Sequence, residues 1–241
     1  MAKLFASYRM TAQGYDATNT RLIDESGLGN HLPLLSGTPD FTGSYSSKTA
    51  FKMHGSAYFG GANLLNPEAW TAIMVVHPKV LAGETLNMVW SSGRYYPLTE
   101  HGHVTPSLPF EDGTSSTAQL TAHRIRMTDS VALVGHDYDS ASTSTGLTLD
   151  AWNVLTAVWN GESSQVRARW GTSAWMTDAI TQHYQVGMME EMRIGYRPTA
   201  LTTASNHLGV LRIDIYSGDF TTDDPTAYAA RVAALTTTPD L

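Results

Sequence analysis

Residues 151–171, AWNVLTAVWNGESSQVRARWG, constrain the fold of this chain more than any other stretch. They predict two β-strands joined by a hairpin turn at Asn160-Gly161, a dipeptide that readily adopts the positive φ angles of a tight turn. Both faces of the first strand are largely apolar, which favours a position near the middle of a sandwich. The return strand alternates between one face with Val166, Ala168 and Trp170 and another with Gln165, Arg167 and Arg169. We therefore expect one buried face and one face in water on this strand.

The composition favours β-structure in the rest of the chain as well. Charged residues make up only 15% of the sequence, while Thr, Ser, Gly and Tyr, typical of strands and turns, are plentiful. The net charge of −7 argues against nucleic-acid binding, and the absence of cysteine excludes disulfides and thiolate metal sites. No run has the length of a membrane span, and the first ten residues lack a secretory signal, so we expect neither membrane insertion nor classical secretion.

Short apolar or alternating runs bounded by turn residues predict further strands. They cover residues 4–10, 50–60, 70–77, 85–90, 118–127, 130–136, 192–196 and 208–216. Residues 91–116, 140–145 and 172–187 are rich in loop-forming residues, and long loops in compact domains often carry function.

One helix is expected near the end of the sequence. Asp224 fits its N-cap and Pro225 its first turn, and Tyr228, Val232 and Leu235 fall on one face. We expect this helix to pack across one end of the sandwich. The whole pattern predicts a single all-β domain over residues 1–241, a two-sheet antiparallel jelly-roll β-sandwich with one short C-terminal helix.

The order of these segments resembles the concanavalin A-like lectin/glucanase superfamily, in particular its laminin-G-like branch. The matching segments are DESGLGNH at 24–31, FKMHG at 51–55, the aromatic strand 70–78, WNVLTAVWNG at 152–161, Ile194-Gly195, and GVLRIDIY at 209–216. The resemblance implies a lectin-like sandwich. The E-x-D-x-x-E spacing of the glucanase branch is absent, which argues against that activity. Leu211 and Arg212 replace an acidic pair of many laminin-G-like members, which argues against a calcium site carried over from them.

Aromatic residues in the expected loops are candidates for binding carbohydrate. Sugars stack their C–H faces on exposed rings, and their hydroxyl groups need fixed polar partners. The alternative is that these aromatic rings fill the core beneath long loops. The candidate residues are Arg94, Tyr95, Tyr96, Asp137, Tyr138 and Trp175.

Two metal sites are considered. Asp24 and Asn30 offer oxygen ligands of the kind that calcium prefers, although the same residues also suit a turn held by side-chain hydrogen bonds. His101 and His103 have a spacing that zinc could use if the segment were extended, but histidines in a proline-rich loop are usually only solvated. No cofactor is required, and calcium is the candidate ion.

Catalysis is the other alternative to binding. A glycoside hydrolase needs two carboxylates across a cleft, and Glu100, Glu111 and Asp112 lie in the long loop. A polysaccharide lyase would use a Tyr or His base beside an arginine, as in the segment from Arg94 to His103. No phosphate-binding loop or hydrolase motif is present, which favours a protein that is not an enzyme.

The sequence therefore predicts a non-catalytic, lectin-like carbohydrate-binding module. A phage or phage-like virion component, such as a head spike, decoration protein or tail-fibre module, fits a fold usually found outside cells without a secretory signal. Its expected partners are a cell-surface glycan and other virion proteins, and homo-oligomerisation stays open. The alternatives are a purely structural virion protein without a ligand, a polysaccharide-degrading enzyme and, for the location, the cytoplasm.

Overall fold

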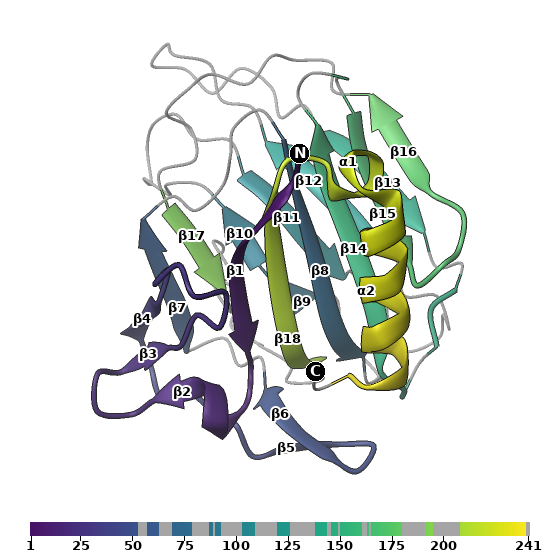
Figure 1. Ribbon diagram of the computed structural model, residues 1–241. Coiled ribbons are helices and arrows are strands. Elements are labelled where there is room, and N and C mark those ends of the chain that lie inside the picture. Colours follow the sequence, from purple (N-terminus) through teal and green to yellow (C-terminus); the bar gives the residue numbers. More distant parts are fainter. Residues whose placement is uncertain are drawn as a thin grey trace.

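Two antiparallel β-sheets stack face to face in this protein (Figure 1). The computed structural model describes residues 1–52, 57–62, 69–78, 87–88, 90–92, 103–108, 120–125, 138–143, 146–148, 150–160, 163, 165–179, 191–194 and 208–239. The all-β sandwich with a short C-terminal helix that the sequence predicts is confirmed.

In the described part of the chain the first sheet has eight strands, and its central strands are rich in buried apolar side chains. Its order is β16 (Met176–Ala179), β15 (Gln165–Trp170), β14 (Asn153–Asn160), β8 (Ala69–Pro78), β18 (Leu208–Ser217), β6 (Lys48–Lys52) and β5 (Gly43–Tyr45), with β1 (Lys3–Arg9) also paired to β18. Strand β14 lies between β15 and β8, so the central position predicted for the first strand of the hairpin is confirmed.

The second sheet has ten strands, many of them only two or three residues long. Its order is β13 (Tyr138–Thr143), β12 (Leu120–Ile125), β11 (His103–Leu108), β10 (Trp90–Ser92), β17 (Glu191–Ile194), β7 (Tyr58–Ala62), β4 (Leu32–Ser36), β3 (Arg21–Leu22) and β2 (Tyr15–Asp16), with β9 (Asn87–Met88) beside β11. A single 3-10 turn, Ala12–Gly14, precedes β2.

The main core lies between the sheets because alternate side chains of each strand point inward. On β15, Ala168 and Trp170 are buried in this core, as the alternation predicts. Arg167 and Arg169 point to the opposite face but are half-buried, so that face is not simply wet. The core also contains Tyr8, Met10, Phe51, Phe59, Trp70, Met74, Leu155, Ile194 and Ile213.

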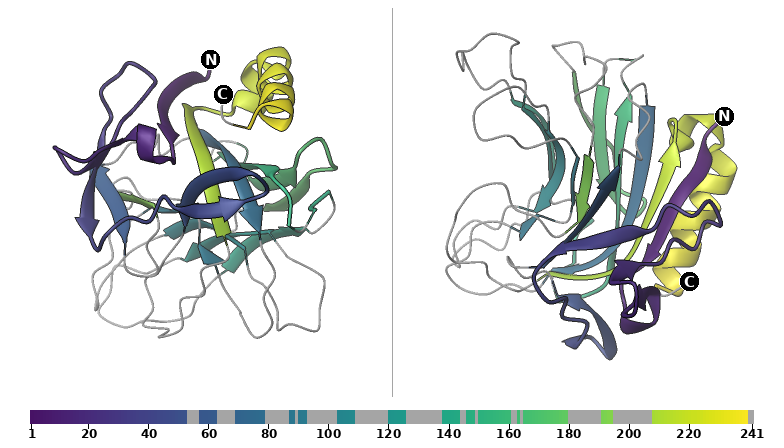
Figure 2. Two further views of the ribbon diagram at one scale, coloured as in Figure 1. Left: turned by 90° about the horizontal axis from the view of Figure 1, so that it is seen from below. Right: turned by 90° about the vertical axis from the view of Figure 1, so that its left-hand side faces the viewer.

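The outer face of the eight-stranded sheet is covered by the C-terminal helices, so three layers stack in the order sheet, sheet, helix (Figure 2, right). Helix α1 (Phe220–Asp223) leads into α2 (Pro225–Thr237), whose first turn is capped by the Asp224 carboxylate, 3.0 Å from the backbone N of Ala227. The predicted cap and helix are confirmed. The predicted location across one end of the sandwich is wrong, because Tyr228, Val232 and Leu235 pack on outward side chains of β8 and β14, Ile73, Val75 and Val154.

Several other sequence predictions need correction. Asn160 pairs with Gln165, so residues 161–164 connect the hairpin in place of a two-residue Asn-Gly turn. Strands β11, β13 and β16 run through segments predicted as loops, and β2 to β5 were not expected as strands. The predicted strand at 130–136 lies outside the described residues. Within the described part of the chain, no helix is long and apolar enough to cross a membrane.

Candidate functional site

Four side chains from three elements meet on the outer face of the eight-stranded sheet, and we call them the Trp175 patch. Arg167 and Arg169 stand two residues apart on β15, so both point away from the inter-sheet core. Trp175 directly precedes β16, which pairs with β15. Tyr228 reaches the same place from the first half of α2. Trp175, Arg167 and Arg169 are half-buried, so part of each remains at the surface.

The Arg169 guanidinium is held in one orientation by both rings of the patch. Its Cζ lies 4.2 Å from the centroid of the Trp175 ring and 5.0 Å from that of Tyr228. The Arg169 Nε donates to the Tyr228 hydroxyl at 3.0 Å, and that hydroxyl donates to Oγ1 of buried Thr156 at 2.9 Å. The two rings are 6.2 Å apart and inclined by 29°. Stacking and hydrogen bonding together restrict the motion of the arginine before any ligand arrives.

The two arginines of the patch differ in their charge partners. Arg167 forms an ion pair with the buried Asp219 carboxylate and donates to the Thr221 hydroxyl at 2.8 Å. Arg169 makes no ion pair with a carboxylate of the described residues. The patch therefore presents one neutralised arginine and one whose positive charge has no acidic partner among them.

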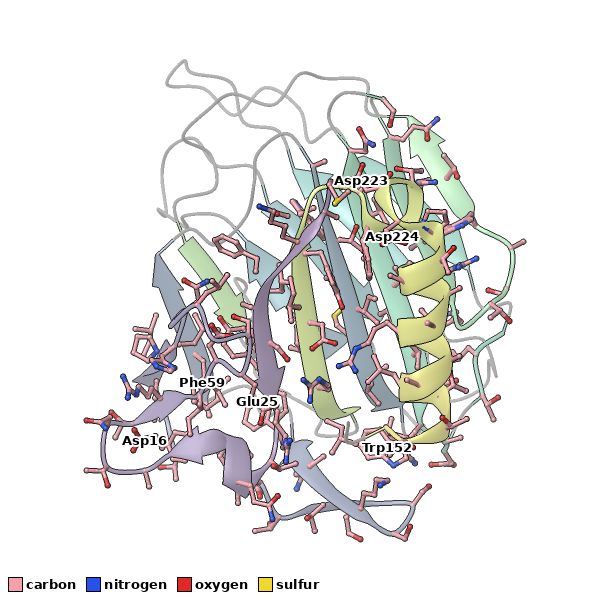
Figure 3. The ribbon with its side chains drawn as sticks, viewed as in Figure 1. Asp16, Glu25, Phe59, Trp152, Asp223 and Asp224 are labelled. Atoms are coloured by element: carbon pink, nitrogen blue, oxygen red, sulfur yellow. The ribbon has the colours of Figure 1, made fainter. Side chains whose placement is uncertain are left out.

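A second charged cluster, the Asp214 network, lies on the other side of α2. The Asp214 carboxylate, which is 1% exposed, accepts hydrogen bonds from Nε of Arg212 at 2.9 Å and from Nη2 of Arg231 at 2.7 Å. The Ser7 hydroxyl donates to the same carboxylate at 2.7 Å and accepts from Nη2 of Arg212 at 2.6 Å. Glu25, labelled beside β1 in Figure 3, lies 3.2 Å from Nη1 of Arg212. Every charge of this network has an opposite charge beside it, which is typical of a structural role.

Asp24 ties down the turn that was considered as a calcium site. Its carboxylate accepts hydrogen bonds from the backbone N of Ser7, Ser26 and Asn30, each at 2.9 Å, and from the Ser26 hydroxyl at 2.7 Å. The Asn30 side chain donates to the backbone oxygen of Phe5 at 2.7 Å. Burial works to raise the pKa of Asp24, but these hydrogen bonds outweigh it and hold the pKa below its usual range.

Calcium binding at Asp24 and Asn30 stays a prediction, although hydrogen bonds already occupy the carboxylate that would act as ligand. No group of three or more His, Asp or Glu side chains with the arrangement of a metal site occurs in the described part of the chain. His101, the first histidine of the considered zinc pair, lies outside the described residues, and His103 begins β11.

Ser46 and His77 form a serine–histidine contact at the opposite end of the sheet's outer face from the Trp175 patch. The Ser46 Oγ lies 2.8 Å from Nε2 of His77 and donates to the backbone oxygen of Asp150 at 3.2 Å. A hydroxyl that donates to Asp150 must accept from Nε2. Nε2 then already carries a proton and has no lone pair with which to act as a general base on the serine hydroxyl. This pair anchors the β5–β6 turn, where Ser46 and Ser47 both have positive φ.

The residues predicted to bind carbohydrate are only partly placed. Arg94, Tyr95, Tyr96 and Asp137 lie outside the described residues, as do Glu100, Glu111 and Asp112. Tyr138 begins strand β13 and is not in a loop. Strand β13 contacts β15 and β16, so β13, which begins with Tyr138, and β16, which directly follows Trp175, lie at the same edge of the sandwich.

Sequence reasoning missed the other three members of the Trp175 patch. The alternation on β15 gives the side of the sheet on which Arg167 and Arg169 lie, but the sequence predicts plain solvent there. Tyr228 follows Arg169 by 59 residues, and its spacing predicts only a buried helix position. The contact could be predicted only once the helix was known to lie on the outer face.

The chain is similar in fold to solved structures, while no protein-family model and no curated protein matches it in sequence. One similar structure is domain 4 of AbnA, a GH43 extracellular arabinanase from Geobacillus stearothermophilus, solved in complex with arabinotriose. The TM-score is 0.62 at 14% identity, over 95% of this chain and 98% of that domain.

Two further similar structures are botulinum neurotoxin chains. The receptor-binding domain of mosaic serotype C/D has a TM-score of 0.61 at 12% identity. Neurotoxin type C, which depends on interaction with two ganglioside molecules to enter cells, has a TM-score of 0.59 at 10% identity. In both cases 95% of this chain is covered, and it spans about half of the toxin chain. At these identities the likeness shows a shared β-sandwich fold.

Proposed function

We propose that this protein is a non-catalytic carbohydrate-binding module and that the Trp175 patch is its binding site. The observation that carries the proposal is a half-buried indole at the surface, fixed beside a guanidinium whose Nη1 and Nη2 donate to no residue that the structure describes. An aromatic ring offers a stacking surface for the C–H face of a sugar, and a fixed guanidinium offers donors to its oxygens. The fold is one that the arabinotriose-bound arabinanase domain also has.

The roles of the residues follow from their geometry. Trp175 is the stacking platform, Arg169 is the polar contact, and Tyr228 holds the arginine in place. The Arg167 guanidinium also lies over the Trp175 ring, with Cζ 5.1 Å from its centroid, and Asp219 holds that arginine by an ion pair. Arg94, Tyr95, Tyr96, Asp137 and Tyr138 are proposed as further sugar contacts, and for Tyr138 the support is that β13 contacts β16.

We also propose the finer identity that the sequence pattern favours, a member of the laminin-G-like branch of the concanavalin A-like superfamily. The order of the matching segments supports it, and five of them contribute described residues to β6, β8, β14, β17 and β18. A virion surface component that contacts host glycans and other virion proteins is proposed on the sequence alone. Recovery of the chain from purified particles, with a partner protein bound to it, would test that role.

The binding experiment is a glycan array probed with the full chain and with two tryptophan variants. Trp175→Ala is expected to weaken binding by about tenfold or more, because a stacked sugar ring loses its platform. Trp152→Ala is the matched control, since Trp152 is also half-buried on the outer face, near the other end of α2 (Figure 3). Equal losses in the two variants, or an array without any binding, would contradict the proposal, and the second result favours a structural protein.

A repeat of the array in EDTA and in calcium tests the metal prediction. Binding that disappears in EDTA and returns with calcium would support a calcium site, with Asp24→Asn as the variant to examine. Binding that is unchanged in EDTA would show that Asp24 and Asn30 serve only the turn described above.

A further inference from the structure

We propose that the ligand of the Trp175 patch is an acidic sugar, a uronic or sialic acid, whose carboxylate is bound by Arg169. This inference rests on the proposed function and adds the chemical class of the ligand.

Arg169 differs from the other arginines whose side chains the structure describes. Arg9 pairs with Glu25, Arg21 with Asp16, Arg167 with Asp219, and Arg212 and Arg231 with Asp214. For Arg169 the described part of the chain supplies two aromatic rings and one hydroxyl, and no carboxylate. A half-buried guanidinium has lost part of its water shell, so an external carboxylate restores more free energy here than at an exposed arginine.

The orientation of Arg169 leaves Nη1 and Nη2 without a hydrogen-bond acceptor among the described residues, so both can donate to a ligand carboxylate. Its Nε is used by the Tyr228 hydroxyl at 3.0 Å, and no hydrogen bond to a described residue uses Nη1 or Nη2. These two nitrogens form the end of the guanidinium fork, whose geometry matches the two oxygens of a carboxylate. Because the arginine is already stacked on Trp175, little side-chain entropy is lost when the ligand binds.

The neighbouring charges permit an anion at this place. Asp219, the acid that pairs with Arg167 of the patch, accepts from Arg167, from the Thr221 hydroxyl and from Nδ2 of Asn160. Its negative charge is therefore compensated before a ligand approaches. The chain as a whole carries a net charge of −7, so the attraction is local contact and not long-range steering.

The test measures binding of the full chain to matched acidic and neutral glycans by titration calorimetry or on an array. The carboxylate is tested by two pairs, 3′-sialyllactose with lactose and oligogalacturonate with its methyl ester. A third pair, dextran sulfate with dextran, tests whether the site binds a sulfate group. One acidic sugar is expected to bind at least about tenfold tighter than its neutral partner, a factor that corresponds to about 1.4 kcal/mol. The preference is expected to shrink as salt increases, because a half-exposed ion pair is screened.

Three variants identify the arginine. Arg169→Gln is expected to remove the preference for the acidic partner, and Arg169→Lys to keep only part of it, because an ammonium cannot bind a carboxylate through a fork. Arg21→Gln is the control, since it removes one positive charge at β3, outside the patch. Thermal unfolding of each variant shows that it is folded before binding is measured.

The outcomes separate this inference from the function on which it rests. Equal binding of acidic and neutral partners, abolished by Trp175→Ala, would overturn the acidic ligand and keep carbohydrate binding. An acidic preference that survives Arg169→Gln, or binding of dextran sulfate alone, would overturn the assignment of a carboxylate to Arg169. Binding of no glycan at all would overturn the proposed function together with this inference.

Discussion

Strand β18, which carries Asp214, and strand β16, which directly follows Trp175, lie on either side of α2 (Figure 1). The Asp214 network and the Trp175 patch use the same kinds of residue in opposite ways. In the network, two arginines from β18 and α2 converge on one buried carboxylate, and Glu25 and Ser7 complete the hydrogen bonds. In the patch, Arg169 meets rings and no acid among the described residues. The first arrangement balances charge within the protein, and the second leaves a positive charge for something outside it.

This contrast separates stability from binding. A buried charge that loses its partner destabilises the fold strongly, whereas a half-exposed arginine without an acid contributes little to folding. We therefore expect substitutions in the network to lower the free energy of unfolding and substitutions in the patch to lower affinity. The four predictions below run from the largest expected change in stability to the smallest.

Asp214→Asn is expected to lower the free energy of unfolding by about 3 kcal/mol, because Arg212 and Arg231 both lose a buried ionic partner. Urea unfolding monitored by tryptophan fluorescence measures the change. Asp223→Asn is the control, since Asp223 is more exposed and pairs only with the N-terminal amine at 3.6 Å. If Asp223→Asn lowered the free energy of unfolding as much as Asp214→Asn, the expected difference between a buried and an exposed acid would be wrong.

Asp24→Asn is expected to cost about 2 kcal/mol at neutral pH, because an amide cannot accept all four hydrogen bonds of the carboxylate. The pKa of Asp24 is lowered in the folded protein, so the unfolded chain binds a proton more readily. Its stabilisation is therefore present above about pH 4 and is lost as the pH falls further. The free energy of unfolding, measured at several pH values, should fall less steeply in acid for the variant than for the original protein. Equal slopes in the two proteins would contradict a stabilising role of the ionised Asp24 carboxylate.

Tyr228→Phe is expected to lower stability by about 1 kcal/mol and to weaken acidic-glycan binding. The variant loses the hydroxyl that accepts from Arg169 and donates to buried Thr156. A double-mutant cycle with Thr156→Val measures the coupling, which should be positive if the hydroxyl pair stabilises the fold. Unchanged glycan binding in Tyr228→Phe would show that Arg169 needs no orientation by the hydroxyl.

Arg169→Gln is expected to change stability least, by less than about 1 kcal/mol, while it has the largest effect on acidic-glycan binding within this group. Thermal unfolding measures the first quantity and the array the second. A loss of stability as large as that of Asp214→Asn, with glycan binding unchanged, would show that Arg169 has a structural role. The contrast between the Asp214 network and the Trp175 patch would then be wrong.

The sequence predicted the elements whose pattern is local. The 3.6-residue spacing of Tyr228, Val232 and Leu235, with Asp224 as cap, predicted α2 correctly. The strands β1, β8, β14 and β18 were equally clear, because long apolar or alternating runs need no tertiary information. Strand β16 was missed because it is four residues long, and β13 because SASTST has the composition of a linker.

The candidate site was predicted only in part because it depends on where elements meet. Trp175 was chosen as a possible sugar contact, and it does reach the surface beside charged groups. Its partner Tyr228 comes from a helix that was expected elsewhere on the sandwich, so no pattern in the sequence connects the two. Whether each of the two neighbouring arginines has an ionic partner depends on Asp219, which is distant in sequence and caps the start of α1.

The pairing of β1 with β18 joins residues 3–9 to residues 212–217, and β18 also pairs with β8 at the centre of the sheet. The eight-stranded sheet therefore cannot close until β18 has been synthesised, and before that β1 has only its local bridge between Tyr8 and Asp24. Contacts this distant in sequence make folding slow. During that delay the edge of β8 that pairs with β18 and the sheet face that α2 covers are both open. An unpaired strand edge beside exposed apolar side chains favours aggregation of such an intermediate.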